Sequence, residues 1–168
     1  SRVLLNATKG TIYVFAVEGK SAPGGLVVLN IAIPLTNDAF STATTVSGPS
    51  FRIAGSNRGA TPESSEPTLS EGAGGRTVWY RWVAPKTRRY QASAFSNEID
   101  AVLGVYRGTG IKTLAEMGTN NDGQNLIYDP LVSFDAIEGQ TYSFAVDSIG
   151  PGGTFTLSLV DSEWQKIV

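Results

Sequence analysis

An internal repeat constrains this chain more than any other feature of its sequence. Residues 7–31 align with residues 136–159 once a single inserted residue in the turn is allowed. Self-similarity of this kind is typical of tandem arrays of one structural unit. The aligned pairs are Ala7 with Ala136, Gly10 with Gly139, Tyr13 with Tyr142, Phe15 with Phe144, Val17 with Val146, Glu18 with Asp147 and Leu29 with Leu157, together with Pro-Gly-Gly at 23–25 and 151–153; Val3 and Leu5 extend the match upstream to Val132 and Phe134.

The repeat predicts three parts in the chain. We expect residues 1–34 to be the tail of a preceding unit and an assembly element, because they carry only the last part of the repeated pattern. Residues 35–160 then form one complete unit. Residues 161–168 are expected to be a linker or the start of a next element.

Composition narrows the class of protein. Nineteen glycines and eight prolines, with few helix-favouring runs, favour an all-β chain with frequent turns. The formal net charge of −2 makes nucleic acid an unexpected partner, and no apolar run approaches the ~18 residues of a membrane span. The chain has no histidine and no cysteine, which excludes His-dependent triads, cysteine nucleophiles and the usual zinc sites. We therefore expect no catalysis and no required cofactor.

Short runs of β-branched and aromatic residues between turn residues predict the strands. The strongest signal lies at 77–83, and others lie at 51–55, 89–94, 101–106, 130–135, 141–146 and 154–160, with a short strand or turn at 113–118. This spacing favours an antiparallel two-sheet β-sandwich, jelly-roll-like, with an extra N-terminal β-hairpin built from strands at 1–6, 11–17 and 26–33. The expected core residues are Tyr80, Trp82, Val102, Tyr142, Phe144 and Leu157.

Several motifs occur in order along residues 37–160. They are NDAF at 37–40, ATPE at 60–63, EP at 66–67, VWYRW at 78–82 with AP at 84–85, DAVLGVY at 100–106, NND at 120–122 and GQTY at 139–142, ending in Val146-Asp147. The series resembles the bacterial pre-peptidase C-terminal domain family and its tandem relatives in large secreted proteins. The resemblance implies a jelly-roll-like sandwich, an extracellular or bacterial cell-surface location and a non-catalytic role. Some relatives bind calcium, and some bind matrix polymers such as collagen.

Three groups of side chains could carry chemistry, and each also has a plainer interpretation. Glu63 and Glu66 offer a carboxylate pair, but a solvated loop or a helix-capping role is the favoured interpretation. Alternation along 78–82 leaves Trp79 outside the core as a candidate for sugar stacking. The side chains of a third group could supply oxygen ligands for calcium, or they could stabilise turns by bonding to nearby backbone. This group consists of Asp100, Asn121, Asp122 and Asp147. In related domains the loop at 120–122 often reads Asn-Asp-Asp, so this chain has one carboxylate fewer there.

The two copies of the repeat differ mainly on one face. In the C-terminal copy, large apolar side chains alternate with small or polar ones, as in a sheet with one face in water. In the N-terminal copy the second face is apolar as well. A strand that is apolar on both faces is normally covered on both, and each large aliphatic side chain left in water forgoes about 1.5–3 kcal/mol. We therefore predict a subunit interface formed by Leu4, Ile12, Val14, Leu26, Val28 and Ala32.

These features predict a non-enzymatic extracellular structural module that repeats as a subunit of a surface fibre or array. The N-terminal hairpin is expected to add to a sheet edge of a neighbouring copy, and head-to-tail addition of this kind builds filaments. Packing of the hairpin on its own domain is the alternative. A second functional class is a module that binds extracellular polysaccharide or matrix protein, with or without calcium. A hydrolase is disfavoured by the missing histidines and cysteines.

Overall fold

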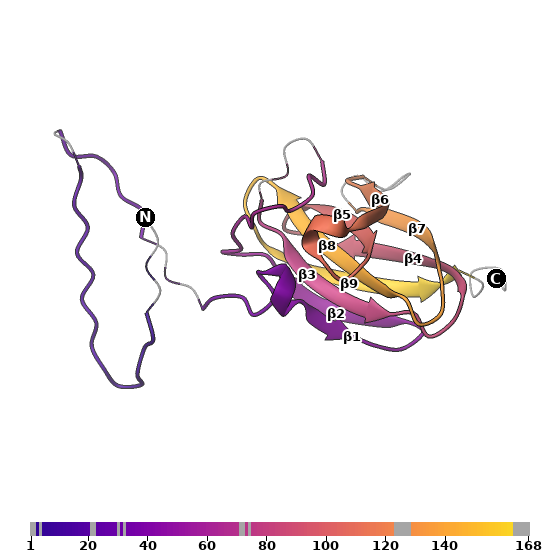
Figure 1. The fold of residues 1–168 in the computed structure, drawn as a ribbon. Coiled ribbons are helices and arrows are strands. Elements are labelled where there is room, and N and C mark those ends of the chain that lie inside the picture. The colour runs from indigo at the N-terminus through magenta and orange to yellow at the C-terminus, as the bar shows by residue number, and fades with distance from the viewer. Residues whose placement is uncertain are drawn as a thin grey trace. The chain divides into compact units, whose positions relative to one another are not determined.

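The computed structural model describes residues 3, 5–20, 23–29, 31, 33–70, 73, 75–122 and 129–162. The chain divides into two compact units, Ser1–Ala32 and Ile33–Val168. The second unit is a β-sandwich, whereas the first is an extended segment (Figure 1). Among the described residues, no helix has the length and apolar character needed to cross a membrane.

The sandwich consists of two sheets in which every strand pair is antiparallel except β1 with β3. The five-stranded sheet has the order β1 (Thr44–Val46), β3 (Val78–Val83), β8 (Thr141–Ile149), β5 (Asp100–Arg107) and β6 (Ala115–Asn120). The four-stranded sheet has the order β2 (Phe51–Ser56), β9 (Thr154–Asp161), β4 (Arg88–Phe95) and β7 (Leu131–Ala136). One 3₁₀ turn, η1 (Phe40–Thr42), precedes β1, and a second, η2 (Ile111–Thr113), lies between β5 and β6. The predicted all-β two-sheet sandwich is confirmed.

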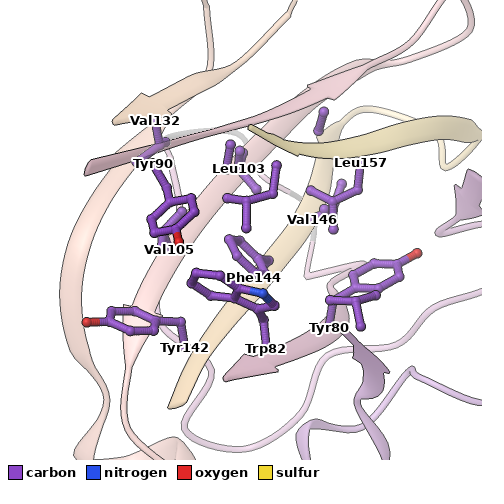
Figure 2. Close-up of a cluster of buried hydrophobic side chains, with 14 of the residues drawn as sticks. Tyr80, Trp82, Tyr90, Leu103, Val105, Val132, Tyr142, Phe144, Val146 and Leu157 are labelled. Atoms are coloured by element: carbon purple, nitrogen blue, oxygen red, sulfur yellow. The ribbon is translucent and has the colours of Figure 1, made fainter. Parts of the chain in front are cut away.

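The main core lies between the two sheets and is rich in aromatic rings (Figure 2). Successive side chains of a strand point to opposite faces, so every second residue of each strand enters this layer. Trp82 of β3 lies among other rings, with its centroid 4.9 Å from that of Tyr90 and 5.9 Å from that of Tyr142. Its indole Nε1 donates a hydrogen bond to the Gly48 carbonyl at 2.9 Å. All six predicted core residues are buried: Tyr80, Trp82, Val102, Tyr142, Phe144 and Leu157.

A second apolar cluster covers the outer face of the five-stranded sheet, which the sequence interpretation had placed partly in water. The side chain of Trp79 is fully buried there, with its ring 5.0 Å from that of Phe40, so the prediction of an exposed Trp79 is wrong. Leu69, from the loop between β2 and β3, is also buried in this cluster. Because this loop and η1 carry apolar residues onto the sheet, β8 is buried on both faces.

The C-terminal copy of the repeat is not a hairpin. β8 pairs with β3 and β5, whereas β9 pairs with β2 and β4 of the opposite sheet. The connection between β8 and β9 therefore crosses from one sheet to the other, and we call residues 136–159 the C-terminal arch. The strands of such an arch find their hydrogen-bonding partners on other strands, not on each other.

The described residues of the first unit contain no β-strand (Figure 1). The predicted strand at 11–17 and the described parts of those at 1–6 and 26–33 are therefore corrected to extended chain without a ladder. The physical reason follows from the C-terminal arch. Residues 7–31, which we call the N-terminal arch, repeat a sequence whose strands pair only with other parts of a sandwich. Extended backbone without those partners does not form a regular strand.

Candidate functional site

The predicted interface residues lie on an exposed part of the N-terminal arch. The side chains of Ile12, Val14 and Leu26 are 91, 90 and 97% exposed, and Val28 is 75% exposed. Leu4 and Ala32, the other two predicted interface residues, lie outside the described residues. The structure therefore leaves four predicted interface side chains open to solvent.

The other face of the N-terminal arch is also open, although its C-terminal counterpart forms the core. Phe15 and Leu29 are 46 and 55% exposed, whereas the matching Phe144 and Leu157 are fully buried. Val17 is 57% exposed, against complete burial of Val146. Both faces of the N-terminal arch thus present apolar side chains that are about half exposed or more.

The turn that opens each arch has the same geometry in both copies, which sequence alignment alone could not show. The backbone N–H of Thr8 donates to the Tyr13 hydroxyl at 2.9 Å, and that of Ile137 donates to the Tyr142 hydroxyl at the same distance. The backbone N–H of Thr11 donates to the Thr8 carbonyl at 3.1 Å. In the C-terminal arch the same 3.1 Å bond joins the residues at 140 and 137.

The glycines and the tyrosine of this corner were the sequence signal for its geometry. Gly10 and Gly139 have φ values of +84° and +75°, which a residue with a side chain rarely adopts. The hydrogen bond from the Thr8 backbone lowers the pKa of the Tyr13 hydroxyl, because an N–H donor stabilises the phenolate. In the N-terminal arch, these hydrogen bonds of the corner join only residues of the arch itself.

The motifs in the loops of the sandwich are structural. Both carboxylate oxygens of Asp38 accept hydrogen bonds from Thr61, through its backbone N–H at 2.7 Å and its hydroxyl at 2.8 Å. Glu63 accepts the backbone N–H of Phe40 at 2.8 Å, which satisfies the first residue of η1. The NDAF and ATPE motifs therefore bind each other, and Glu63 has the capping role that was one of its two expected roles.

A pocket of about 230 Å³ lies beneath the same loop and contains Glu63, Glu66 and Asp147. Asp147 of β8 is buried and accepts the backbone N–H groups of Gly75 at 3.1 Å and Arg76 at 3.0 Å. Burial raises the pKa of the Glu66 carboxyl, and repulsion from the other two carboxylates adds to the shift. Two of these three carboxylates therefore hold the loop on the sheet, so the pair Glu63 and Glu66 is not arranged as a free acid and base.

The expected calcium ligands separate into two places. The carboxylate of Asp147 accepts hydrogen bonds from the loop backbone. Asp100 begins β5, where burial first and the charge of Asp122 second raise the pKa of its carboxyl. Three buried oxygens on β5, on β6 and in the turn after β6 have no hydrogen-bond partner among the described residues: Asp100 Oδ1, Asn120 Oδ1 and Asn121 Oδ1. Orphan buried oxygens of carboxylates and amides suit the hard-oxygen preference of Ca²⁺. We call Asp100, Asn120, Asn121 and Asp122 the oxygen cluster.

The oxygen cluster is short of negative charge. Within the described part of the chain, no group of three or more Asp, Glu, His or Cys residues could hold a metal ion. The cluster offers two carboxylates and two amide oxygens. Asn120 belongs to the loop at 120–122 that the sequence had already indicated, although it was not in the predicted ligand group.

Comparison with family models gives no match, and comparison with curated proteins gives none either. Among solved structures, the pre-peptidase C-terminal domain of a collagenase from Bacillus anthracis is 16% identical, with a TM-score of 0.46 and coverage of 70% of this chain and 93% of that one. PliG from Aeromonas hydrophila, a periplasmic inhibitor of g-type lysozyme, is 18% identical, with a TM-score of 0.47 and coverage of 70% and 96%. PliG from Salmonella Typhimurium is 15% identical, with a TM-score of 0.39 and coverage of 70% and 98%.

Proposed function

We propose that this chain is a non-catalytic structural module of an extracellular or periplasmic protein, and that its N-terminal arch joins it to another unit in a fibre or array. The observation that carries the proposal is the exposure of both faces of the arch. Ile12 and Val14 on one face and Phe15 and Val17 on the other are all close to half exposed or more. An arch that remained in this state would leave most of its apolar surface in water.

Burial on a partner is the favourable alternative for these side chains. Each large aliphatic side chain transferred out of water contributes about 1.5–3 kcal/mol. Backbone N–H and C=O groups of extended chain also gain partners when a strand is added to a sheet. Because the arch and the sandwich belong to one chain, contact between the arch of one copy and the sandwich of the next is head-to-tail. Contacts of this type form open filaments unless the rotation closes.

The non-catalytic part of the proposal rests on the side chains that are present. The chain has no histidine and no cysteine, and two of the three carboxylates in the loop pocket accept backbone N–H groups. The ordered motifs resemble a family of secreted proteins, which supports a location outside the cytoplasm.

The test is a pair of substitutions on the exposed face of the arch. Val14→Lys with Val28→Lys should abolish assembly of the full chain, as followed by sedimentation velocity and electron microscopy, while the sandwich keeps its thermal transition. The matched control is Val83→Lys with Ile137→Lys, which replaces two half-exposed apolar residues of the sandwich and should leave assembly intact. Normal assembly of the arch double variant contradicts the proposal.

A second candidate function is calcium-dependent binding, and the oxygen cluster favours it. Three buried oxygens without partners among the described residues are costly unless a cation or another donor satisfies them. We propose that Asp100 and Asp122 supply the charge and Asn120 and Asn121 the amide oxygens for Ca²⁺. Millimolar CaCl₂ should raise the melting temperature of the wild-type chain but not that of Asp100→Asn. An equal rise in both proteins, or none in the wild type, argues against this site.

A further inference from the structure

We infer that the N-terminal arch docks on a second copy of this chain, at the side of the sandwich where β1 and β2 are the outermost strands. Segment 11–17 would extend the five-stranded sheet beyond β1, and segment 26–31 would extend the four-stranded sheet beyond β2. This inference rests on the proposed assembly role and identifies the acceptor surface. Every copy offers this surface, because β1 and β2 each pair on one side only among the described residues.

The two acceptor strands lie on the same side of the sandwich. β6 and β7, the last strands of the two sheets in the other direction, contact each other. β1 and β2 are therefore the pair of edges on the opposite side, where Figure 1 shows them next to each other. A ligand that bridges the two sheets can reach both of these edges at once.

The C-terminal arch shows how a segment of this sequence bridges two sheets. Its first strand, β8, lies in the five-stranded sheet, and its second, β9, lies in the four-stranded sheet. The turn that crosses between them contains Pro-Gly-Gly at 151–153. The N-terminal arch keeps Pro-Gly-Gly at 23–25 and the corner hydrogen bond of Tyr13. It therefore suits a site that offers one edge from each sheet.

The strand directions on this side suit the arch. β1 is parallel to β3 and hence antiparallel to β8, and β2 is antiparallel to β9. An arch in the orientation of the C-terminal arch is thus antiparallel to both edges, which is the slightly more stable pairing. On the other side, β6 is parallel to β8 and β7 is parallel to β9. The same orientation would give only parallel pairs there.

The core is also less complete beside β2. Its inward side chains Phe51 and Ile53 are only partly buried, whereas Val132 and Phe134, the inward side chains of β7, are 5 and 3% exposed. β1 has only three residues, so the five-stranded sheet gives little cover to the six residues of β2. Apolar surface therefore remains to be buried at this side and not at the other.

The register of the C-terminal arch brings apolar side chains of the N-terminal arch to this gap. β9 pairs Leu157 with Ile53 and Leu159 with Phe51, and Leu29 and Ile31 are the residues aligned with these two. Both are exposed in the N-terminal arch, at 55 and 73%. Docking in the same register on the free edge of β2 would bury them against the partly buried side chains of β2. Apolar burial of this kind favours association.

β2 lacks the features that usually prevent strand addition, which are prolines, bulges and several charges. Residues 51–56 contain no proline, and Arg52 is their one charged residue. Their ladder with β9 is regular over all six residues. β6, by contrast, pairs with β5 through a register shift and carries Glu116. The edge at β2 is therefore the more receptive of the two.

The same register places the turn and the outward side chains of the arch. Gly25 would lie opposite Asn57, as Gly153 does, and Asn57 is fully buried, which leaves little room for a side chain at position 25. Val28 would lie beside Ala54 on the open face of the four-stranded sheet. Lysine on an edge strand is a usual device against pairing, so Val14→Lys with Val28→Lys remains a test of assembly itself.

The test is a cross-link between two full-length single-cysteine proteins, since the chain has no cysteine of its own. Val28→Cys is mixed with Ala54→Cys, and the mixture is oxidised under assembly conditions. The matched control mixes Val28→Cys with Leu131→Cys, which places an equally outward and exposed cysteine on β7. The first pair should give on the order of tenfold more mixed disulfide, because a disulfide needs Cα atoms within about 7 Å.

Two further acceptors, Arg52→Cys and Ser56→Cys, detect docking that is shifted by two residues along β2. Peptide mapping by mass spectrometry identifies the linked positions, and thermal denaturation checks that each variant keeps its fold. The inference is overturned if none of the three β2 acceptors links to position 28 in assembled protein, or if Leu131→Cys links as well as they do.

Sedimentation of the unaltered chain separates this inference from the proposed function. Assembly without a link to β2 contradicts the acceptor site and leaves the assembly role standing. A chain that stays monomeric contradicts the assembly role. A disulfide that forms within one monomer carrying both Val28→Cys and Ala54→Cys, without cross-linking between the separate variants, shows docking on the arch's own sandwich and contradicts both.

Discussion

The two arches carry nearly the same pattern of residues but have opposite environments. In the C-terminal arch, Tyr142 and Phe144 are fully buried between two sheets, whereas in the N-terminal arch the matching Phe15 is 46% exposed. The corner with its tyrosine is formed in both. The comparison teaches that the local turn is encoded within the arch, whereas the strands require partners from elsewhere in a sandwich.

The comparison also changes what can be inferred from a strand that is apolar on both faces. β8 is itself buried on both faces because the loop between β2 and β3 covers the five-stranded sheet. An apolar second face therefore need not indicate a contact outside the fold. It is the normal requirement of this position, and Ser143, whose buried hydroxyl has no partner among the described residues, is the unusual case.

The largest difference between the arches is expected for their central phenylalanines. Phe144→Ala should lower the free energy of unfolding by about 3–5 kcal/mol, because it leaves a cavity in the core. Phe15→Ala should change it by no more than about 0.5 kcal/mol in dispersed protein, because that ring has no core around it. Urea denaturation followed by tryptophan fluorescence measures both. Similar losses in the two variants would mean that the N-terminal arch is already packed.

The turn glycines give a second comparison between the arches, with a smaller expected change in the free energy of unfolding. Gly153→Ala should cost about 1–3 kcal/mol of unfolding free energy, since the new Cβ would lie 2.5 Å from Ile99 Cγ2. Gly25→Ala should leave the stability of dispersed protein unchanged and should weaken assembly. Thermal denaturation and sedimentation of both variants check the pair. A destabilised Gly25→Ala monomer speaks against the account.

A pH-dependent effect is expected in the loop that covers β8. The raised pKa of Glu66 means that the folded state binds its proton more tightly than the unfolded chain does. Its contribution to stability is fully present below the unfolded pKa and is lost as pH rises through the folded pKa. Glu66→Gln should therefore stabilise the sandwich at pH 7 and have little effect at pH 3, as measured by thermal denaturation at the two values. A stabilisation that is independent of pH would rule out the charge as its cause.

The smallest effect is expected where the C-terminal arch contacts an exposed carboxylate. The backbone N–H of Thr154 and then the guanidinium of Arg58 lower the pKa of Glu98 from 4.5 to about 2. A lowered carboxyl pKa contributes stability above the unfolded value, which is lost as pH falls from 4.5 towards 2. Glu98→Gln should flatten the stability curve in that window, which thermal denaturation between pH 2 and pH 6 would reveal. A curve of unchanged slope would show that this contact is already lost in solution.

Much of the sandwich could be predicted from alternation and turn residues. The strands at 51–55, 89–94 and 154–160 were found within a few residues of their observed bounds, because each alternates between more and less buried residues. The strand at 101–106, which is buried on both faces, was found from its continuous apolar run. Burial of Trp79 could not be predicted, because it depends on a loop whose anchor, Leu69, lies in a polar and glycine-rich stretch.

The candidate sites depend on pairing between distant strands, which local sequence does not encode. In sequence, the segment from β8 to β9 resembles a hairpin, because the connection between the two strands is short and contains Pro-Gly-Gly. In the structure this connection crosses from one sheet to the other. The residues of the oxygen cluster come from β5, from the end of β6 and from the turn after it, and these two strands pair although Asp100 is distant from the turn in sequence. Neither arrangement follows from residue spacing.

Amide hydrogen exchange of the two arches, in dispersed and in assembled protein, tests the central claim most directly. In dispersed protein, residues 142–146 should be protected to the level of global unfolding, and residues 12–17 should exchange at the rate of unstructured chain. In assembled protein, both stretches should be protected. The account is contradicted if residues 12–17 are already protected in dispersed protein, or if they remain unprotected after assembly.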